Sequence, residues 1–131
     1  LSFEEIKITI SSLFGRIDVD ELIVDNDDIQ YLFHIFRGKR NPERFSIHLR
    51  FKETHDILVR VDINPSNKHI NPDGKIILGN HIHIYSNKYP KRDSIAIPLE
   101  ESNFPNINTI SDVFSAFIRY TNIRKEEIPN E

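Results

Sequence analysis

The chain has 131 residues, of which 38% are hydrophobic and 28% are charged, and it contains no cysteine. This length predicts one domain with its own core, while the charge content and the lack of a long apolar run argue against a membrane protein. The lack of cysteine excludes a disulfide framework, a thiol nucleophile and a zinc site with Cys ligands.

The net charge of −3 hides an uneven distribution along the chain. Residues 1–36 carry eight acids and two bases, whereas residues 37–99 carry twelve bases and six acids. A locally basic surface attracts a phosphate backbone, although the same pattern also suits an acidic segment that balances a basic sheet. No leader segment is visible and we expect a cytoplasmic protein, with its start trimmed because residue 1 is Leu.

The first predicted element is a helix. Ser2 and Glu5 have the spacing of a capping box, and apolar residues recur behind them at helical spacing, so residues 3–15 are predicted to form an amphipathic helix. An ambiguous acidic segment follows. Its predicted elements are a short strand at Glu21–Val24, a turn at Asp25–Asp28, a strand at Tyr31–Arg37 and a basic turn at Gly38–Pro42.

The clearest alternation comes next, in two runs that predict a β-hairpin. Phe45–Lys52 and Ile57–Ile63 each alternate between apolar and polar side chains. An odd-length loop centred on His55 keeps both apolar rows on one face. That register places Arg50 opposite Arg60 and His48 opposite Asp62.

The remaining elements complete an α+β fold. A long connection over Asn64–Asn80 contains a turn at Asn71–Gly74 and a short strand at Lys75–Leu78. Strands at His81–Tyr85 and Ser94–Leu99 follow, the second an edge strand because it contains Pro98, and Thr109 and Asp112 open a C-terminal helix before a polar tail from Arg124. We therefore expect an antiparallel sheet of four to six strands with N- and C-terminal helices packed on one face.

The polar face of this sheet gathers residues that are suited to chemistry. In a strand, His81, His83 and Tyr85 share one side, while Ile82 and Ile84 take the other. The face is predicted to carry His48, Arg50, Arg60, Asp62, His81, His83 and Tyr85, with His69 and Asp73 in the preceding loop. Polar and charged side chains are also expected on any solvent-exposed sheet face. The alternative interpretation is therefore that these residues only face solvent and have no function.

The leading hypothesis is a nucleic-acid-directed protein, and specifically a toxin-type endoribonuclease that needs no metal or other cofactor. His81 and His83 would serve as base and acid, Arg60 would bind the phosphate, and Asp62 would orient a histidine or Arg60. Tyr85 would stack on a base or donate to phosphate, and the substrate-binding candidates are His48, Arg50, His69 and Asp73.

Two alternatives remain open at this point. His81 and His83, two residues apart in a strand, can chelate one divalent transition-metal ion, with Asp62, His48 or His69 completing the site of a metal-dependent enzyme. The chain could instead be a non-catalytic module of prophage type that binds another protein.

Residues 58–99 resemble a small uncharacterised family of bacterial and phage-associated proteins. The resemblance rests on Arg60-Val61-Asp62, on His69-Ile70-Asn71-Pro72-Asp73-Gly74, on His81-Ile82-His83-Ile84-Tyr85 and on Ala96-Ile97-Pro98-Leu99. The chain departs from that pattern at Ser86-Asn87-Lys88, where the family has an acidic residue and a glycine. The resemblance implies no known activity, but it implies that seven residues belong together: Arg60, Asp62, His69, Asp73, His81, His83 and Tyr85. RNA and a protein partner such as an antitoxin are the expected partners, and no membrane contact is expected.

Overall fold

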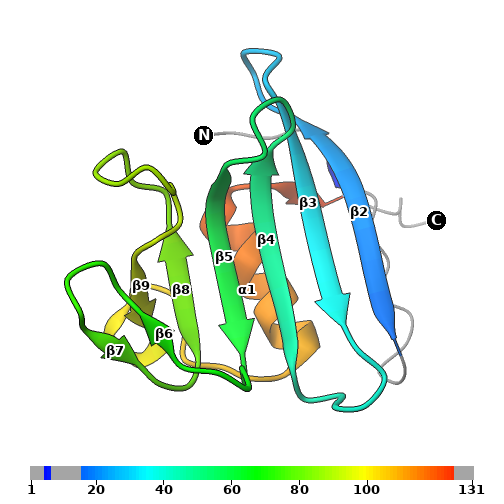
Figure 1. Ribbon diagram of the computed structural model, residues 1–131. Helices are drawn as coiled ribbons and strands as arrows, with labels where there is room; N and C mark the ends of the chain where they lie inside the picture. The colour runs from blue at the N-terminus through cyan, green and yellow to red at the C-terminus, as the bar shows by residue number, and fades with distance from the viewer. Residues whose placement is uncertain (1–4, 7–15, 126–131) are drawn as a thin grey trace.

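The computed structural model describes residues 5–6 and 16–125. Its main feature is an antiparallel sheet of six strands in the order β2-β3-β4-β5-β8-β9, shown in Figure 1. Its strands are β2 (Ile17–Val24), β3 (Gln30–Arg37), β4 (Phe45–Phe51), β5 (Ile57–Ile63), β8 (His81–Ile84) and β9 (Ala96–Pro98).

The smaller elements lie around this sheet. A two-stranded antiparallel hairpin of β6 (His69–Ile70) and β7 (Ile76–Ile77) lies next to β8 and β9 (Figure 1). The chain then forms a short 3-10 helix at Leu99–Glu101 and the helix α1 (Ile110–Thr121). Two short strands near the ends, β1 (Glu5–Ile6) and β10 (Arg124–Lys125), pair in parallel.

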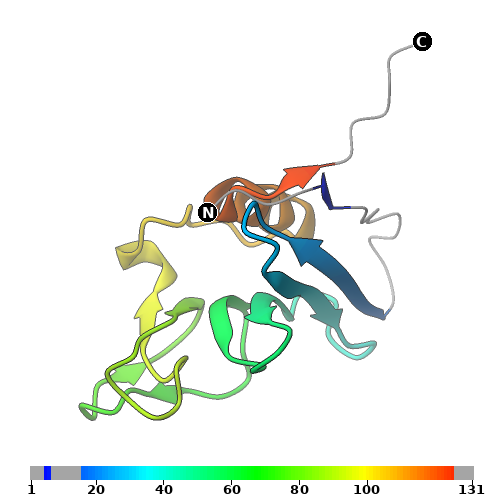
Figure 2. The same cartoon turned by 90° about the horizontal axis from the view of Figure 1, so that it is seen from above.

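The core lies between α1 and one face of the sheet, and Figure 2 shows the helix on that side. Alternation in β3 buries Tyr31, Phe33 and Ile35, because successive side chains of a strand point to opposite faces. The ring of Phe33 meets Phe114 and Phe117 of α1 edge-on, with centroid distances of 5.9 and 5.6 Å. The opposite face of β4, β5 and β8 is therefore left for polar side chains.

Both ends of α1 follow from local chemistry. The Thr109 hydroxyl accepts a hydrogen bond from the Asp112 amide and donates one to the Asp112 carboxylate, so the predicted start of the helix is confirmed. The helix ends at Asn122, which adopts the left-handed conformation that stops helices.

The predicted N-terminal helix is not part of the fold as described. Glu5–Ile6 forms the strand β1, and residues 3–4 and 7–15 of the predicted helix lie outside the described residues. Backbone pairing with β10 replaces helical hydrogen bonds at Glu5–Ile6. The α+β class is confirmed in its coarser form, as a mainly antiparallel sheet with a single longer helix among the described residues.

The predicted register of the central hairpin is wrong by two residues. His48 lies opposite Arg60, and Ser46 lies opposite Asp62. The register shifts between Leu49 and Arg50, so Leu58 is an extra residue on β5, and its side chain packs against the core instead of the polar face. The shift is even, and the polar and apolar faces therefore remain as predicted.

Other local predictions are confirmed. The Asn71–Gly74 turn closes with a hydrogen bond of 2.8 Å from the Gly74 amide to the Asn71 carbonyl, and Gly74 has a φ of 89°, which favours glycine. Pro98 lies in β9, at the edge of the sheet. Within the described residues, no helix is both long and apolar enough to cross a membrane.

Candidate functional site

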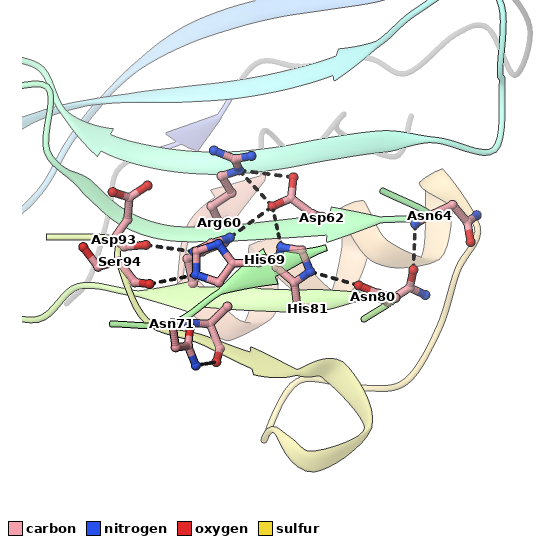
Figure 3. A network of polar contacts seen from close by, with 12 residues as sticks. Arg60, Asp62, Asn64, His69, Asn71, Asn80, His81, Asp93 and Ser94 are labelled. Atoms are coloured by element: carbon pink, nitrogen blue, oxygen red, sulfur yellow. Dashed lines mark hydrogen bonds and ion pairs between the residues drawn. The ribbon is translucent and has the colours of Figure 1, made fainter. Parts of the chain in front are cut away.

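Two neighbouring strands bring an aspartate and two histidines together. The pairing of β5 with β8 places His81 opposite Asp62 and His83 opposite Arg60. The Oδ2 atom of Asp62 lies 3.2 Å from Nε2 of His81 and 3.4 Å from Nε2 of His83. All three residues are buried, at 7%, 4% and 5% exposure. We call Asp62, His81 and His83 the His–Asp cluster, and Figure 3 labels Asp62 and His81 of this group.

The backbone fixes the orientation of both imidazole rings. Nδ1 of His81 lies 2.9 Å from the Gly79 carbonyl oxygen, and Nδ1 of His83 lies 2.8 Å from the Asp93 carbonyl oxygen. A carbonyl oxygen can only accept, so each Nδ1 must carry the proton and donate it. With Nδ1 occupied, Nε2 faces Asp62: a charged ring donates its second N–H to the carboxylate, whereas a neutral ring presents a lone pair that a cation bound between the two groups would accept.

Arg60 holds the carboxylate from the solvent side. Its Nε atom donates to both oxygens of Asp62, at 3.1 and 3.0 Å, and its side chain is 40% exposed. The two residues follow each other at i and i+2 on β5, so their side chains share the polar face. Arg60 therefore links the buried His–Asp cluster to the exterior.

The pKa values of the cluster reflect this pairing. Burial alone would raise the pKa of Asp62, but hydrogen bonds with His81 and His83 and the charge of Arg60 outweigh it, and the pKa is lowered. Burial alone would lower the pKa of His81, but its hydrogen bonds to Asp62 and to the Gly79 carbonyl raise it. The arrangement thus favours an anionic Asp62 carboxylate beside a protonated His81 ring.

The β6–β7 hairpin adds a third imidazole. Nε2 of His69 lies 2.8 Å from the Ser94 carbonyl oxygen, and the His69 ring centroid is 4.7 Å from that of His83. The buried Asn71 side chain both donates to and accepts from the Ala96 backbone, at 2.9 and 2.8 Å. The Asn71 side chain thus makes the hydrogen bonds that a neighbouring strand would make with the edge strand β9. These bonds hold the β6–β7 hairpin, and with it His69, beside the His–Asp cluster (Figure 3).

The His–Asp cluster opens into a cavity of about 870 Å³. Arg60 and His69 also line it, together with residues from the turn between β3 and β4, from the loop before β6 and from the loop after β8. Five further cationic side chains line this cavity, and we call them the basic rim: Lys39, Arg40, Arg44, Lys68 and Lys91. The cavity therefore combines imidazoles and a carboxylate with a positively charged surround.

Two predicted substrate-binding residues lie on the same face but outside this cavity. The rings of His48 and His34 are stacked, with centroids 5.0 Å apart and planes at 8°. Arg50 Nη1 lies 3.5 Å from His48 Nε2, while its Nε is buried without a hydrogen-bond partner among the described residues. His34 is bound by Asp20 at 2.6 Å, so these residues form a neighbouring polar group instead of part of the cluster.

Tyr85 and Asp73 are not brought to the His–Asp cluster. The Tyr85 hydroxyl donates to Asn87, and its ring meets Phe51 edge-on beside a different cavity of about 710 Å³. The Asp73 carboxylate accepts from the Lys75 amide and stabilises the tip of the β6–β7 hairpin.

Sequence reasoning missed the basic rim as part of the site. The cationic turn at 38–42 and the basic stretch at 89–93 were visible as composition, and they could have been assigned to the site only with the fold in hand. The backbone carbonyls of Gly79 and Asp93 were also missed, and nothing in the sequence signals them.

Comparisons with curated proteins and with solved structures gave no match. One family model does match, over residues 3–123, and its description is that of a family of unknown function (DUF6978). The match covers most of the chain and agrees with the resemblance to an uncharacterised family. The chain therefore belongs to this family of unknown function, DUF6978.

Proposed function

We propose that this protein binds RNA at the basic rim and cleaves it at the His–Asp cluster. The proposal is based on one cavity that contains both kinds of group. The five cations of the basic rim, Arg60, and the imidazoles of His69, His81 and His83 all line the same space. Cations attract a phosphate backbone, and imidazoles can transfer protons near neutral pH.

The proposed reaction is an internal phosphoryl transfer. The ribose 2′-oxygen loses its proton to a base and bonds to phosphorus, while the bond from phosphorus to the 5′-oxygen breaks. The 5′-oxygen takes up a proton, and the products end in a cyclic 2′,3′-phosphate and a 5′-hydroxyl. Arg60, with its partly exposed guanidinium, is suited to stabilise the charge that develops on the phosphate oxygens.

The arrangement of the rings bears on how the protons move. A metal-free mechanism requires His81 and His83 to act as separate base and acid. Both rings instead direct Nε2 at the same oxygen of Asp62, and their centroids are only 4.8 Å apart. This geometry favours a mechanism in which the two histidines act together with Asp62 as one unit, with His69 the imidazole left for a separate proton transfer.

The proposal is tested by incubating purified protein with a labelled RNA, with and without chelator. We expect cleavage by the wild type, with the rate lowered by at least about 100-fold in His83→Gln, as is typical when an acid–base group is lost. His34→Ala is the matched control, because it removes an imidazole from the same sheet face outside the cavity and should keep full activity.

Growth arrest on expression in a bacterial host, relieved by His83→Gln, would support the toxin-type role. If the folded wild type neither cleaves nor binds RNA under any of these conditions, the proposal fails. A protein-binding role would gain if a cellular phenotype survived His83→Gln and Arg60→Ala unchanged.

A further inference from the structure

We infer that Asp62, His81 and His83 form a binding site for one divalent first-row transition-metal ion. The ligands are a carboxylate oxygen of Asp62 and the Nε2 atoms of the two histidines. This inference does not depend on RNA being the substrate, because it rests on the geometry of the His–Asp cluster alone.

The two oxygen–nitrogen separations of the cluster fit a common ion. The three potential ligand atoms all lie within 4.8 Å of one another, and the Asp62 oxygen is 3.2 and 3.4 Å from the two nitrogens. Ligands bonded at about 2.1 Å, at angles between octahedral and tetrahedral, are about 3.0–3.4 Å apart. The oxygen–nitrogen separations therefore already match those around a metal ion.

The outer contacts are those that metal-binding histidines require. A ligating imidazole normally donates its other ring N–H to a carbonyl or carboxylate, which fixes the ring and leaves one lone pair for the metal. His81 donates from Nδ1 to the Gly79 carbonyl and His83 donates from Nδ1 to the Asp93 carbonyl. Arg60 orients the Asp62 carboxylate in the same way.

The ligand set also indicates the class of metal. Two imidazole nitrogens and one carboxylate oxygen suit Zn²⁺, Fe²⁺ and similar ions, whereas Mg²⁺ and Ca²⁺ prefer sites built from oxygen alone. Three protein ligands at the wall of an open cavity leave a position for water or substrate, as in catalytic metal sites. His69 lies close to His83, but its Nε2 is bound to the Ser94 carbonyl and it is not one of the three converging groups.

The chain provides its own control for this inference. His34 lies on the same face of the sheet and contacts two carboxylates, Asp20 at 2.6 Å through Nδ1 and Asp18 at 3.5 Å through Nε2. The two carboxylates meet opposite nitrogens of the ring, so their oxygens do not converge with one nitrogen on a single point. Both groups thus contain histidine and aspartate, but only in the His–Asp cluster do the ligand atoms point toward one another.

The test is to titrate chelator-treated protein with Zn²⁺, Fe²⁺ under anaerobic conditions, and Mg²⁺, by calorimetry. We expect saturable binding of a single Zn²⁺ or Fe²⁺ ion and no comparable binding of Mg²⁺. His83→Gln and Asp62→Asn should weaken binding by on the order of 100-fold or more, since even outer-shell changes cost 10–100-fold. His34→Ala should bind as the wild type does.

Two further measurements guard against variants that fail to fold. Circular dichroism checks each variant, and the visible spectrum of Co²⁺-loaded wild type reports nitrogen and oxygen ligation without any substitution. Zn²⁺ should raise the melting temperature of the wild type and leave that of folded His83→Gln unchanged. Absence of saturable binding by the wild type, or full-strength binding in folded His83→Gln, would overturn the inference. If RNA cleavage persists in chelator while Zn²⁺ still binds, the metal site stands and the metal takes no part in the cleavage reaction.

Discussion

At the scale of single residues, the second nitrogen of each imidazole decides what the ring can do. His81 and His83 have Nδ1 bound to backbone carbonyls, and their Nε2 atoms converge on Asp62. His34 and His48 stack face to face instead, and their nitrogens meet different partners. Four histidines on one sheet face therefore divide into a convergent pair and a stacked pair.

The stacked pair gives a pH-dependent prediction. The pKa of His48 falls from 6.5 to about 4, mainly because burial disfavours the charged ring, and the charges of His34, Arg50 and Arg60 add to this. Between these two pH values the unfolded chain binds a proton that the folded chain does not. The contribution of His48 to the free energy of unfolding therefore falls as pH drops from about 6.5 to about 4, by about 3 kcal/mol.

Urea unfolding at a series of pH values checks this contribution. His48→Gln should show a shallower loss of stability across that range than the wild type. His55→Asn is the control, because His55 lies in an exposed turn with a φ of 63°, which asparagine tolerates. An unchanged pH dependence in folded His48→Gln would show that the ring is protonated normally in the folded protein.

At the scale of elements, the β6–β7 hairpin depends on one side chain for its position. Asn71 is 7% exposed, and its amide group makes two hydrogen bonds with the backbone of Ala96 on the edge strand β9. Because the hairpin carries His69, this clamp connects the edge of the sheet to the functional site. A change there should alter the site without touching the His–Asp cluster.

Asn71→Ala should therefore destabilise the protein by about 2 kcal/mol, since it leaves a buried N–H and a buried C=O without partners. Amide hydrogen exchange at Ala96 and in the β6–β7 hairpin should rise more than exchange in β3 or β4. Asn67→Ala, at an exposed position in the same connection, should change neither quantity. Equal protection of the hairpin in Asn71→Ala and the wild type would contradict the clamp.

The sequence predicted the elements better than their pairing. Alternation in the two runs after Phe45 revealed both strands and both faces, because burial of one face demands that pattern. The register escaped prediction because the extra residue at Leu58 depends on how the hairpin packs on the core. The convergence of Asp62 with His81 depends on the pairing of β5 with β8 across a long connection, which local pattern cannot specify.

At the scale of the whole molecule, a chain of net charge −3 presents a basic cavity. Basic residues concentrated in the middle of the chain are brought to one place by the turn between β3 and β4, by the loop before β6 and by the loop after β8. Local charge density, rather than net charge, determines attraction to a polyanion. The proposed RNA binding should consequently depend on the basic rim and on salt.

If each cation of the basic rim neutralises one phosphate of a single strand, the logarithm of the RNA binding constant should fall with the logarithm of salt concentration with a slope of about −3.5. The triple variant Lys39→Ala, Arg40→Ala, Arg44→Ala should make that slope shallower by about 2. Arg119→Gln, an exposed cation of α1 outside the cavity, is the control and should keep the wild-type slope. Fluorescence anisotropy with a labelled single-stranded RNA measures both, and an identical slope in the triple variant would place the RNA elsewhere.

We infer that the Nε2 atoms of His81 and His83 converge with Asp62 to hold a metal ion while their Nδ1 atoms stay bound to the backbone. Proton–nitrogen correlation NMR of the histidine side chains, recorded before and after addition of Zn²⁺, tests it most directly. We predict that Nδ1 of both rings remains protonated, that Nε2 of both shifts to the position of a metal-bound nitrogen, and that His34 is unaffected. Unchanged His81 and His83 signals at saturating Zn²⁺, or protonation at Nε2 with Nδ1 bare, would show that these rings do not bind the metal ion through Nε2.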